Sequence, residues 1–330
     1  MNVFLSVDTE IWPFSDGWPT VPLAAAHTDF SAEIGFYIEG STGKGSFGLP
    51  FQLDCLKQHG LKATFFVESL SAGVTGSKVL KDIVALIGSY GQEVQLHCHT
   101  EWLSELRDPE LPARFRQYLR QFSLAEQTAI IARAAANLRQ AGAGAPCAFR
   151  AGSFGANFDT LRALAANRIR FDSSHNACFL GISCGLDTGE LLTQPRLLEG
   201  VHEFPMSVFS DYPGHYRHAQ LGACSYGELT EALLGAWRAG WYAFVILLHG
   251  SELLGERRNF TVPAGPAAIV VRRFRRLCEF LAQNTDKFRT TAFSEIDPAA
   301  IPSSGRLLPS ATGLHRTAWR MAEQLAGRIL

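Results

Sequence analysis

The sequence lacks the cysteine spacing of a disulfide-bonded or Cys-x-x-Cys protein. Its 330 residues include seven cysteines, an odd number, and no two of them form a Cys-x-x-Cys pair. Scattered thiols of this kind fit a reducing compartment better than a disulfide framework. We therefore expect a cytoplasmic protein.

Long hydrophobic runs are also missing. The most apolar run, WYAFVILL at 241–248, is far shorter than the roughly 20 residues that span a bilayer. Near the first residue, NVFLSVD leads into an acidic side chain, without the basic segment and apolar stretch of a secretory signal. The sequence therefore predicts a soluble protein with no transmembrane segment.

Neither sign of charge is in excess. The formal net charge is −1 and the sequence pI is about 6.8, so nothing in the charge balance indicates nucleic acid or an anionic membrane surface as a partner. One local basic cluster stands out, formed by Arg272, Arg273, Arg275 and Arg276. We interpret it as the solvated face of a helix.

What the sequence does contain is enough apolar material for a large core. Hydrophobic residues make up 47% and charged residues 18%, which is typical of a folded globular chain. A length of 330 residues is long for one domain, but (β/α) barrels reach this size as a single unit.

Short apolar runs alternate with segments of helical period, which is typical of parallel α/β architecture. Strands are expected at 3–7, 62–68, 93–97, 147–152, 168–174, 201–207, 242–250 and 287–293. Helices are expected at 49–60, 77–91, 123–142, 225–239 and 265–284, with another that begins at Asn157. Loops, lids or short helices are expected at 12–47, 101–123 and 175–200.

The last part of the chain differs in composition. Residues 298–312 are rich in Pro, Ser and Gly and predict a linker, and a final helix follows with Leu314, Met321 and Leu325 on one stripe. We expect this stripe to dock on the body. The chain is thus expected to form a catalytic barrel over 1–297, with a linker and docked helix over 298–330.

Titratable residues stand at or just after the carboxyl ends of the expected strands. They are Asp8 and Glu10, His97, His99 and Glu101, Arg150, Asp172, and His249. The carboxyl ends of the strands in a parallel barrel converge on one mouth, where active sites lie. Each residue alone has an ordinary structural explanation, such as a turn cap, an ion pair or a buried histidine. Their joint occurrence predicts a site.

The residue types indicate metal-assisted hydrolysis. His and carboxylate ligands suit Zn²⁺ and similar divalent ions. In an extended segment, residues two apart point to one face, so His97 and His99 share a face, as do Asp8 and Glu10. A carboxylate near the metal-activated water accepts its proton, and a histidine opposite protonates the leaving group.

At these residues the sequence resembles the polysaccharide deacetylase family, the NodB-homology carbohydrate esterases. Five motifs occur in the family's order: SVDTE (6–10), HCHTE (97–101), RAGSFG (150–155), FDSS (171–174) and LLH (247–249). The match spans about residues 1–295. The resemblance implies an α/β fold, a distorted (β/α)7-type barrel with parallel strands, to which this chain adds a C-terminal helix.

The resemblance also implies roles. Asp8 is the expected general base and His249 the general acid. Arg150 is expected to tether Asp8, and Asp172 to tune His249. His97 is expected to bind metal, and backbone N–H groups near Ser153 and Phe154 to form the oxyanion site.

Three departures suggest an outlying branch. Thr9 stands where the common first motif has a metal-binding aspartate, so we expect Glu10 to be the ligand, with Asp8 as the alternative. Glu101 stands where the second motif has its second histidine; we expect His99 as the ligand, with Glu101 a ligand or outer acceptor otherwise. The third motif lacks the usual proline.

The expected activity is removal of an N- or O-linked acetyl group from a small or lipid-linked saccharide, with one divalent metal ion. Zinc is the expected metal, and Co, Ni or Fe are alternatives. Trp12, Trp102 and Tyr212 are expected to contact sugar rings or to pack the rim. The competing functions are hydrolysis of a non-sugar amide and an inactive carbohydrate-binding or scaffold role.

Overall fold

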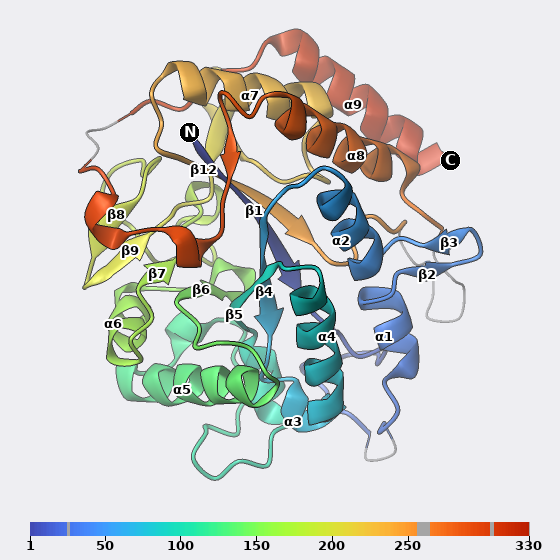
Figure 1. Ribbon diagram of the computed structural model, residues 1–330. Helices are drawn as coiled ribbons and strands as arrows, with labels where there is room; N and C mark the ends of the chain where they lie inside the picture. Colours follow the sequence, from blue (N-terminus) through green and yellow to red (C-terminus); the bar gives the residue numbers. More distant parts are fainter. Residues whose placement is uncertain (25–26, 256–264, 304–306, 330) are drawn as a thin grey trace.

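A curved, mostly parallel sheet forms the centre of the molecule (Figure 1). The computed structural model describes residues 1–24, 27–255, 265–303 and 307–329. Seven of the described strands run parallel in the spatial order β12 (Ala243–His249), β1 (Asn2–Thr9), β4 (Ala63–Glu68), β5 (Glu93–Cys98), β6 (Ala148–Ala151), β7 (Phe171–Asp172) and β9 (Val201–Glu203). The predicted distorted (β/α)7-type barrel is confirmed.

The remaining strands are short additions. Strand β8 (Arg196–Leu198) pairs antiparallel with β9, and β13 (Arg289–Thr290) pairs with β1. Two antiparallel hairpins lie outside the barrel: β2 (Ser41–Thr42) with β3 (Gly45–Ser46), and β10 (Val208–Tyr212) with β11 (His215–His218). The sequence predicts loops or no defined element at the positions of β2, β3, β8, β10 and β11.

The ring does not close through a continuous ladder between β9 and β12. Instead, Val245 N donates to Ser207 Oγ at 2.8 Å, and Tyr242 N donates to Gln194 Oε1 at 2.8 Å. The backbone after β11 also pairs with Leu247, which donates its N–H to Ala219 O at 2.8 Å. Between β9 and β12, side-chain hydrogen bonds and a loop therefore take the place of a strand. This gap in the ladder makes the barrel distorted.

Helices surround the sheet. They are α1 (Ser31–Tyr37), α2 (Leu49–Gln58), α3 (Ala72–Thr75), α4 (Ser77–Ser89), α5 (Leu124–Gln140), α6 (Phe158–Ala166), α7 (Tyr226–Arg238), α8 (Ala268–Gln283) and α9 (Leu314–Ile329). Short 3₁₀ helices are η1 (Thr100–Ser104), η2 (Leu119–Gln121), η3 (Gly152–Phe154), η4 (Ala177–Phe179), η5 (Phe293–Glu295) and η6 (Pro298–Ala300). None of the helices in the described ranges is long and apolar enough to cross a bilayer.

The expected capping boxes start two of these helices. Ser123 caps α5 and Ser225 caps α7, each with a glutamate three residues later that bonds back to the serine N–H. The expected loop at 12–47 contains α1 and the β2–β3 hairpin, and its residues 25–26 lie outside the described residues. Residues 304–306 of the expected linker also lie outside them.

The core has two layers because strand side chains alternate. One cluster fills the barrel interior and includes Phe4, Phe66, Phe171, Phe204 and Phe293. A larger cluster fills the space between the sheet and the helices. On β1, Phe4 faces the interior and its neighbours Val3 and Leu5 face the helices, so the even-numbered residues of β1 face the interior.

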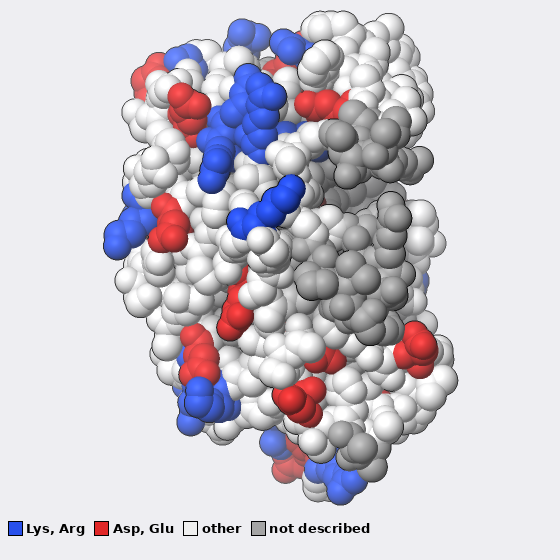
Figure 2. Space-filling model, turned by 90° about the vertical axis from the view of Figure 1, so that its right-hand side faces the viewer, with Lys and Arg blue, Asp and Glu red and all other residues white. Residues whose placement is uncertain are grey.

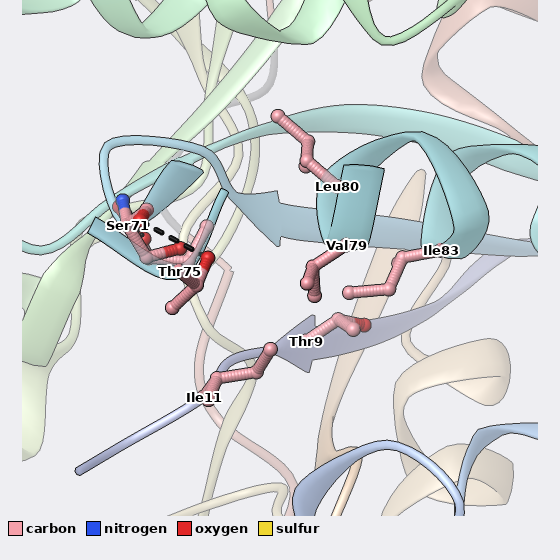
Figure 3. Close-up of a pocket in the computed structure, with 8 residues that line it drawn as sticks. Thr9, Ile11, Ser71, Thr75, Val79, Leu80 and Ile83 are labelled. Atoms are coloured by element: carbon pink, nitrogen blue, oxygen red, sulfur yellow. Dashed lines mark hydrogen bonds between the residues drawn. The ribbon is translucent and has the colours of Figure 1, made fainter. Parts of the chain in front are cut away.

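Figure 3 shows the consequence at the end of β1. Thr9 and Ile11 lie on the side of α4 to which Val79 and Ile83 point, and Leu80 also lines the space between them. A cavity of about 10 Å³ lies between them, with room for a single water. Asp8 is therefore left facing the barrel, and Thr9 has a packing role on the helix side.

The C-terminal helix corrects one prediction. The expected stripe does not dock, because Leu314, Met321 and Leu325 are 65%, 56% and 61% exposed. Helix α9 is held by its polar side instead, where Arg320 bonds to Glu228. Helical period shows which residues share a face, but the ion pairs determine which face turns inward.

Candidate metal centre and acid–base site

Three potential metal ligands converge at the mouth of the barrel. One ligand atom from each of Glu10, His97 and His99 lies within 4.8 Å of the other two. The Nε2 atom of His97 is 2.9 Å from Glu10 Oε1, and the Nε2 atom of His99 is 3.0 Å from the same oxygen. The structure thus brings together the three residues that the sequence analysis chose.

The other ring nitrogen of each histidine is held by the protein. His97 Nδ1 is 2.8 Å from the backbone oxygen of Arg150, and His99 Nδ1 is 3.2 Å from Glu101 Oε2. Such contacts fix the tautomer and the ring direction of a metal-binding histidine. Of the two alternatives left open by the sequence, this geometry favours His99 as the inward ligand and Glu101 as its outer acceptor.

The charges in this cluster influence one another strongly. Burial alone raises the pKa of Glu10, but the charge of His99 and the hydrogen bonds from His97 and His99 outweigh it and hold that pKa well below its usual range. Burial lowers the pKa of His99, but Glu101 and Glu10 together raise it well above the usual value. The carboxylate form of Glu10 and the doubly protonated, cationic form of His99 therefore stabilise each other.

Trp12 closes one side of the cluster. Its Nε1 donates to Glu10 Oε2 at 2.8 Å, and its ring stands edge-on to His99 with the centroids 4.5 Å apart. The indole is only partly buried. It therefore fixes the second oxygen of Glu10 and still presents surface to a ligand.

Asp8 is fixed by a buried arginine. Arg150 Nη1 donates to Asp8 Oδ1 at 2.6 Å, and the guanidinium has no exposed surface. The same guanidinium donates to Ser6 Oγ at 2.8 Å and to the backbone oxygen of Ser173 at 3.0 Å. It also lies over the ring of Phe66, with its Cζ 4.5 Å from the centroid. Arg150 therefore holds Asp8 in one orientation, as the resemblance implies.

His249 stands beside Asp8 on the neighbouring strand. The two residues are register partners in the β1–β12 pair. Ligand atoms of Asp8, Glu10 and His249 all lie within 4.8 Å of one another, so this triad is a second possible ligand set that shares Glu10 with the first. The first set contains two imidazoles and leaves Asp8 and His249 available for proton transfer.

Asp172 does not lie where its expected role requires. Phe171 faces the barrel interior, so the next residue of β7 faces the helices. There Asp172 accepts a hydrogen bond from Ser174 Oγ at 2.6 Å and lies in register with Glu203 of β9. Within the described part of the chain it makes no hydrogen bond or ion pair with His249. The expected contact between Asp172 and His249 is therefore corrected.

The buried carboxyl groups of Asp172 and Glu203 both have raised pKa values. Burial raises the pKa of Asp172, and burial together with the charge of Asp172 raises the pKa of Glu203 well above the usual range. Register places these two residues opposite each other on β7 and β9. Their raised pKa values favour the protonated form of this pair, which lies on the outer side of the sheet.

Ser153 and Phe154 have an uncommon backbone conformation. Their φ angles are 53° and 58°, in the left-handed region that non-glycine residues rarely adopt. The turn follows directly on β6, so it lies at the mouth of the barrel. Strained backbone of this kind often occurs at functional sites, which fits the predicted oxyanion site.

The aromatic residues expected to contact sugar rings lie in different surroundings. Trp102 has no exposed surface and packs against Trp18, with the centroids 5.0 Å apart, so for this residue the structure favours packing of the rim. Tyr212 lies at the end of β10, where it stacks on His215 at 4.4 Å. Phe154, which belongs to the expected oxyanion turn, stacks on Phe179 with the centroids 5.7 Å apart.

Several residues that support the site carry little or no signal in the sequence. Ser6 lies two residues before Asp8, and Ser173 directly follows Asp172; both bind the guanidinium of Arg150. Glu252 is partly buried next to His249, to whose backbone oxygen its N–H donates at 3.2 Å, and its carboxylate accepts from Gln220 Nε2 at 2.7 Å. The period of two along β1 was a signal for Ser6, whereas Gln220 and Glu252 lie in loops that carry no periodic signal.

Comparison with solved structures identifies the fold. A protein from Mycobacterium smegmatis assigned as a polysaccharide deacetylase superposes with a TM-score of 0.55 at 17% identity, over 94% of this chain and 93% of that chain. A 4-alpha-glucanotransferase from Thermococcus litoralis superposes with a TM-score of 0.52 at 12% identity, over 89% of this chain and 40% of that chain. The sequence itself matches no family model and no curated protein.

The chain therefore has the NodB-like fold of the polysaccharide deacetylases, as the sequence resemblance predicts. At these identities the similarity establishes the fold, and the activity must be argued from the site.

Proposed function

We propose that the protein is a metal-dependent hydrolase that removes an N- or O-linked acetyl group from a saccharide or saccharide precursor. One observation carries the proposal: Nε2 of His97 and Nε2 of His99 both point at Glu10 Oε1, while their Nδ1 atoms are held by Arg150 O and Glu101. Two anchored imidazoles and one carboxylate at a single point are the donor set of a catalytic divalent ion.

Zinc suits this donor set best, and cobalt, nickel or iron are accepted by the same ligands. When bound, the ion supplies an activated water whose pKa falls to roughly 7, and it polarises the acyl carbonyl. Glu10, His97 and His99 would hold it, and Glu101 would keep the ring of His99 in place.

The neighbouring residues divide the proton transfers. Asp8, fixed by Arg150, would accept a proton from the attacking water. His249, on the adjacent strand, would donate a proton to the departing amine or alkoxide. The N–H groups of Ser153 and Phe154 would bind the developing negative charge on the acyl oxygen.

The proposed substrate is a small or lipid-linked saccharide that is handled in the cytoplasm. All seven cysteines are free thiols in the structure, which fits a reducing compartment. The partly exposed ring of Trp12 and the Phe154–Phe179 pair offer apolar faces of the kind that sugar rings contact.

The first experiment measures metal content by elemental analysis. We expect about one zinc, cobalt, nickel or iron per wild-type chain and a loss of that ion in His97→Ala. The matched control is His59→Ala, because His59 lies at the C-terminal end of α2 and belongs to neither candidate ligand set. A wild-type protein that stays free of metal after reconstitution would exclude the metal-dependent mechanism.

The second experiment measures acetate release from a panel of acetylated saccharides and, in parallel, hydrolysis of small non-sugar amides. Turnover of the saccharides supports the proposal. Turnover confined to the amides would make the protein an amidase. Saccharide binding without turnover, unchanged in Asp8→Asn, would identify an inactive binding or scaffold protein.

A further inference from the structure

Helix α9 exposes a continuous apolar surface. Leu314, Met321 and Leu325 are each more than half exposed, and Ala318 lies between them on the same stripe. Trp319 on the adjoining flank is 61% exposed. We call these five residues the α9 face. Large hydrophobic side chains are grouped on it rather than scattered singly, and such grouping marks a contact surface.

The polar side of the helix fixes this orientation. Arg320 is 5% exposed and donates to Glu228 Oε1 at 3.0 Å and to Asp211 Oδ2 at 3.2 Å. Thr317 Oγ1 donates to the backbone oxygen of Asp211 at 3.1 Å. Turning the α9 face inward would leave two buried carboxylates without their arginine, so the apolar surface is held outward.

The neighbouring helix α8 carries a cationic surface. Arg272, Arg275 and Arg276 on α8 are exposed, and we call them the α8 arginines. None of them forms an ion pair with a carboxylate in the described ranges; Arg276 lies over Tyr226 instead, with its Cζ 3.9 Å from the ring centroid. The fourth arginine of the sequence cluster, Arg273, is buried and pairs with Glu323 of α9 at 2.6 Å.

This last pair locks α8 and α9 side by side. In Figure 2, Lys and Arg side chains gather in the upper part of the face, next to a broad uncharged area, and α8 and α9 reach this part of the molecule in Figure 1. The expectation of a solvated helix face is therefore correct for three arginines and wrong for Arg273.

We propose that the α9 face and the α8 arginines together bind an anionic lipid surface peripherally. Leu, Met and Trp side chains enter the boundary between headgroups and acyl chains, while arginines remain beside the lipid phosphates. Charge favours this partner over a second copy of the chain. In a two-fold dimer built on this face, the same patch meets itself, which brings like charges together. This inference does not depend on the proposed catalytic activity.

The test is flotation of the full chain with phosphatidylcholine vesicles, prepared with and without phosphatidylglycerol. We expect binding only to the anionic vesicles, and release as added salt shortens the Debye length from about 10 Å to about 3 Å. Leu325→Glu should weaken binding roughly tenfold, because it replaces inserted apolar surface with a negative charge. Arg272→Gln should weaken it about fivefold, the effect expected for one arginine near a charged membrane.

Two matched controls keep the result specific. Leu197→Glu changes an equally exposed leucine on β8, and Arg139→Gln changes an exposed arginine on α5. Both should bind as the wild type does. Absence of vesicle binding, or equal binding to neutral and anionic vesicles, would overturn the proposal. The proposal would also be overturned if the wild type binds no vesicles but sediments as a dimer that Leu325→Glu dissociates. That result would assign the α9 face to a second copy of the chain.

Discussion

Gly152 lies directly against the imidazole ring of His99. A β-carbon at position 152 would come within 2.6 Å of His99 Nδ1 and 2.7 Å of its Cε1. Glycine is therefore required at this point of the third motif because a metal-ligand candidate from the second motif occupies the space.

Gly152→Ala is expected to displace the His99 ring and to reduce bound metal strongly, since the ring also contacts Glu101 and Glu10. Elemental analysis and circular dichroism together would separate metal loss from unfolding. Gly144→Ala is the control, because a β-carbon there meets nothing within 4 Å. Full metal occupancy in Gly152→Ala would show that His99 is not a ligand.

Asp8→Asn is expected to lower kcat by about 10²–10⁴-fold, the usual contribution of a general base, while the metal content stays at the wild-type level. The amide keeps the shape of the side chain but cannot accept the proton. The measurement is kcat alongside metal stoichiometry. Loss of the ion would instead assign Asp8 as a ligand, the alternative that its distance from Glu10 leaves open.

His249→Ala is expected to retain metal and to lose activity in a substrate-dependent manner. An acid catalyst matters most when the leaving group is basic, so an acetylated amine should suffer more than an aryl acetate, whose leaving group needs no proton. The ratio of kcat/KM for the two substrates checks this. An equal loss for both would contradict the acid role.

The stability of the protein is expected to fall in mild acid because of His175. This residue is fully buried, and burial lowers its pKa to about 4, while Asp187 opposes the shift only partly. Between about pH 6.5 and pH 4 the unfolded chain binds a proton that the folded chain does not, which removes about 3 kcal/mol of stability.

Urea unfolding at several pH values measures this effect, with His175→Gln as the comparison. The variant should lose less stability than the wild type as the pH falls. The Asp172–Glu203 pair contributes the opposite trend, since a raised carboxyl pKa removes stability as the pH rises. The pair is present in both proteins, so the difference isolates His175. Parallel curves would exclude the histidine as the cause.

Arg320→Ala is expected to destabilise the protein by about 3–5 kcal/mol, because it leaves the buried carboxylate of Glu228 without a cation and removes one of the cationic partners of Asp211. Arg316→Ala is the control, since its ion pair with Glu231 is about half exposed and is worth roughly 1 kcal/mol or less. Chemical denaturation measures both variants. Equal effects would mean that burial of the Arg320 pairs does not anchor α9.

Much of the site could be predicted because it depends on local rules. The period of two in a strand places Asp8 and Glu10 on one face, and the convergence of parallel strand ends brings His97, His99 and His249 to the same mouth. The structure confirms these proximities, with the shortest contacts at Glu10. The catalytic and metal-binding roles stay predictions.

The same rules failed where both faces of a strand are buried. Phe171 and Asp172 are both fully inaccessible, so hydrophobicity could not indicate which of them faces the barrel. The placement of Asp172 depends on Glu203, a partner from a later strand. The apolar stripe of α9 failed for a related reason, because its direction depends on ion pairs of Arg320 with residues far away in the sequence.

The central position of β1 has a consequence for the order in which the site forms during synthesis. β1 lies between β4 and β12, and Asp8 pairs in register with His249, near the other end of the barrel sequence. At roughly 5–20 residues per second, a ribosome needs about ten to fifty seconds to make the chain between them. Throughout that interval the edge of β1 that pairs with β12 has no hydrogen-bonding partner. An unpaired apolar edge can pair with strands of other chains. The expected base and acid are therefore brought together only by one of the last strands to emerge, and no nascent fragment that ends before β12 carries both.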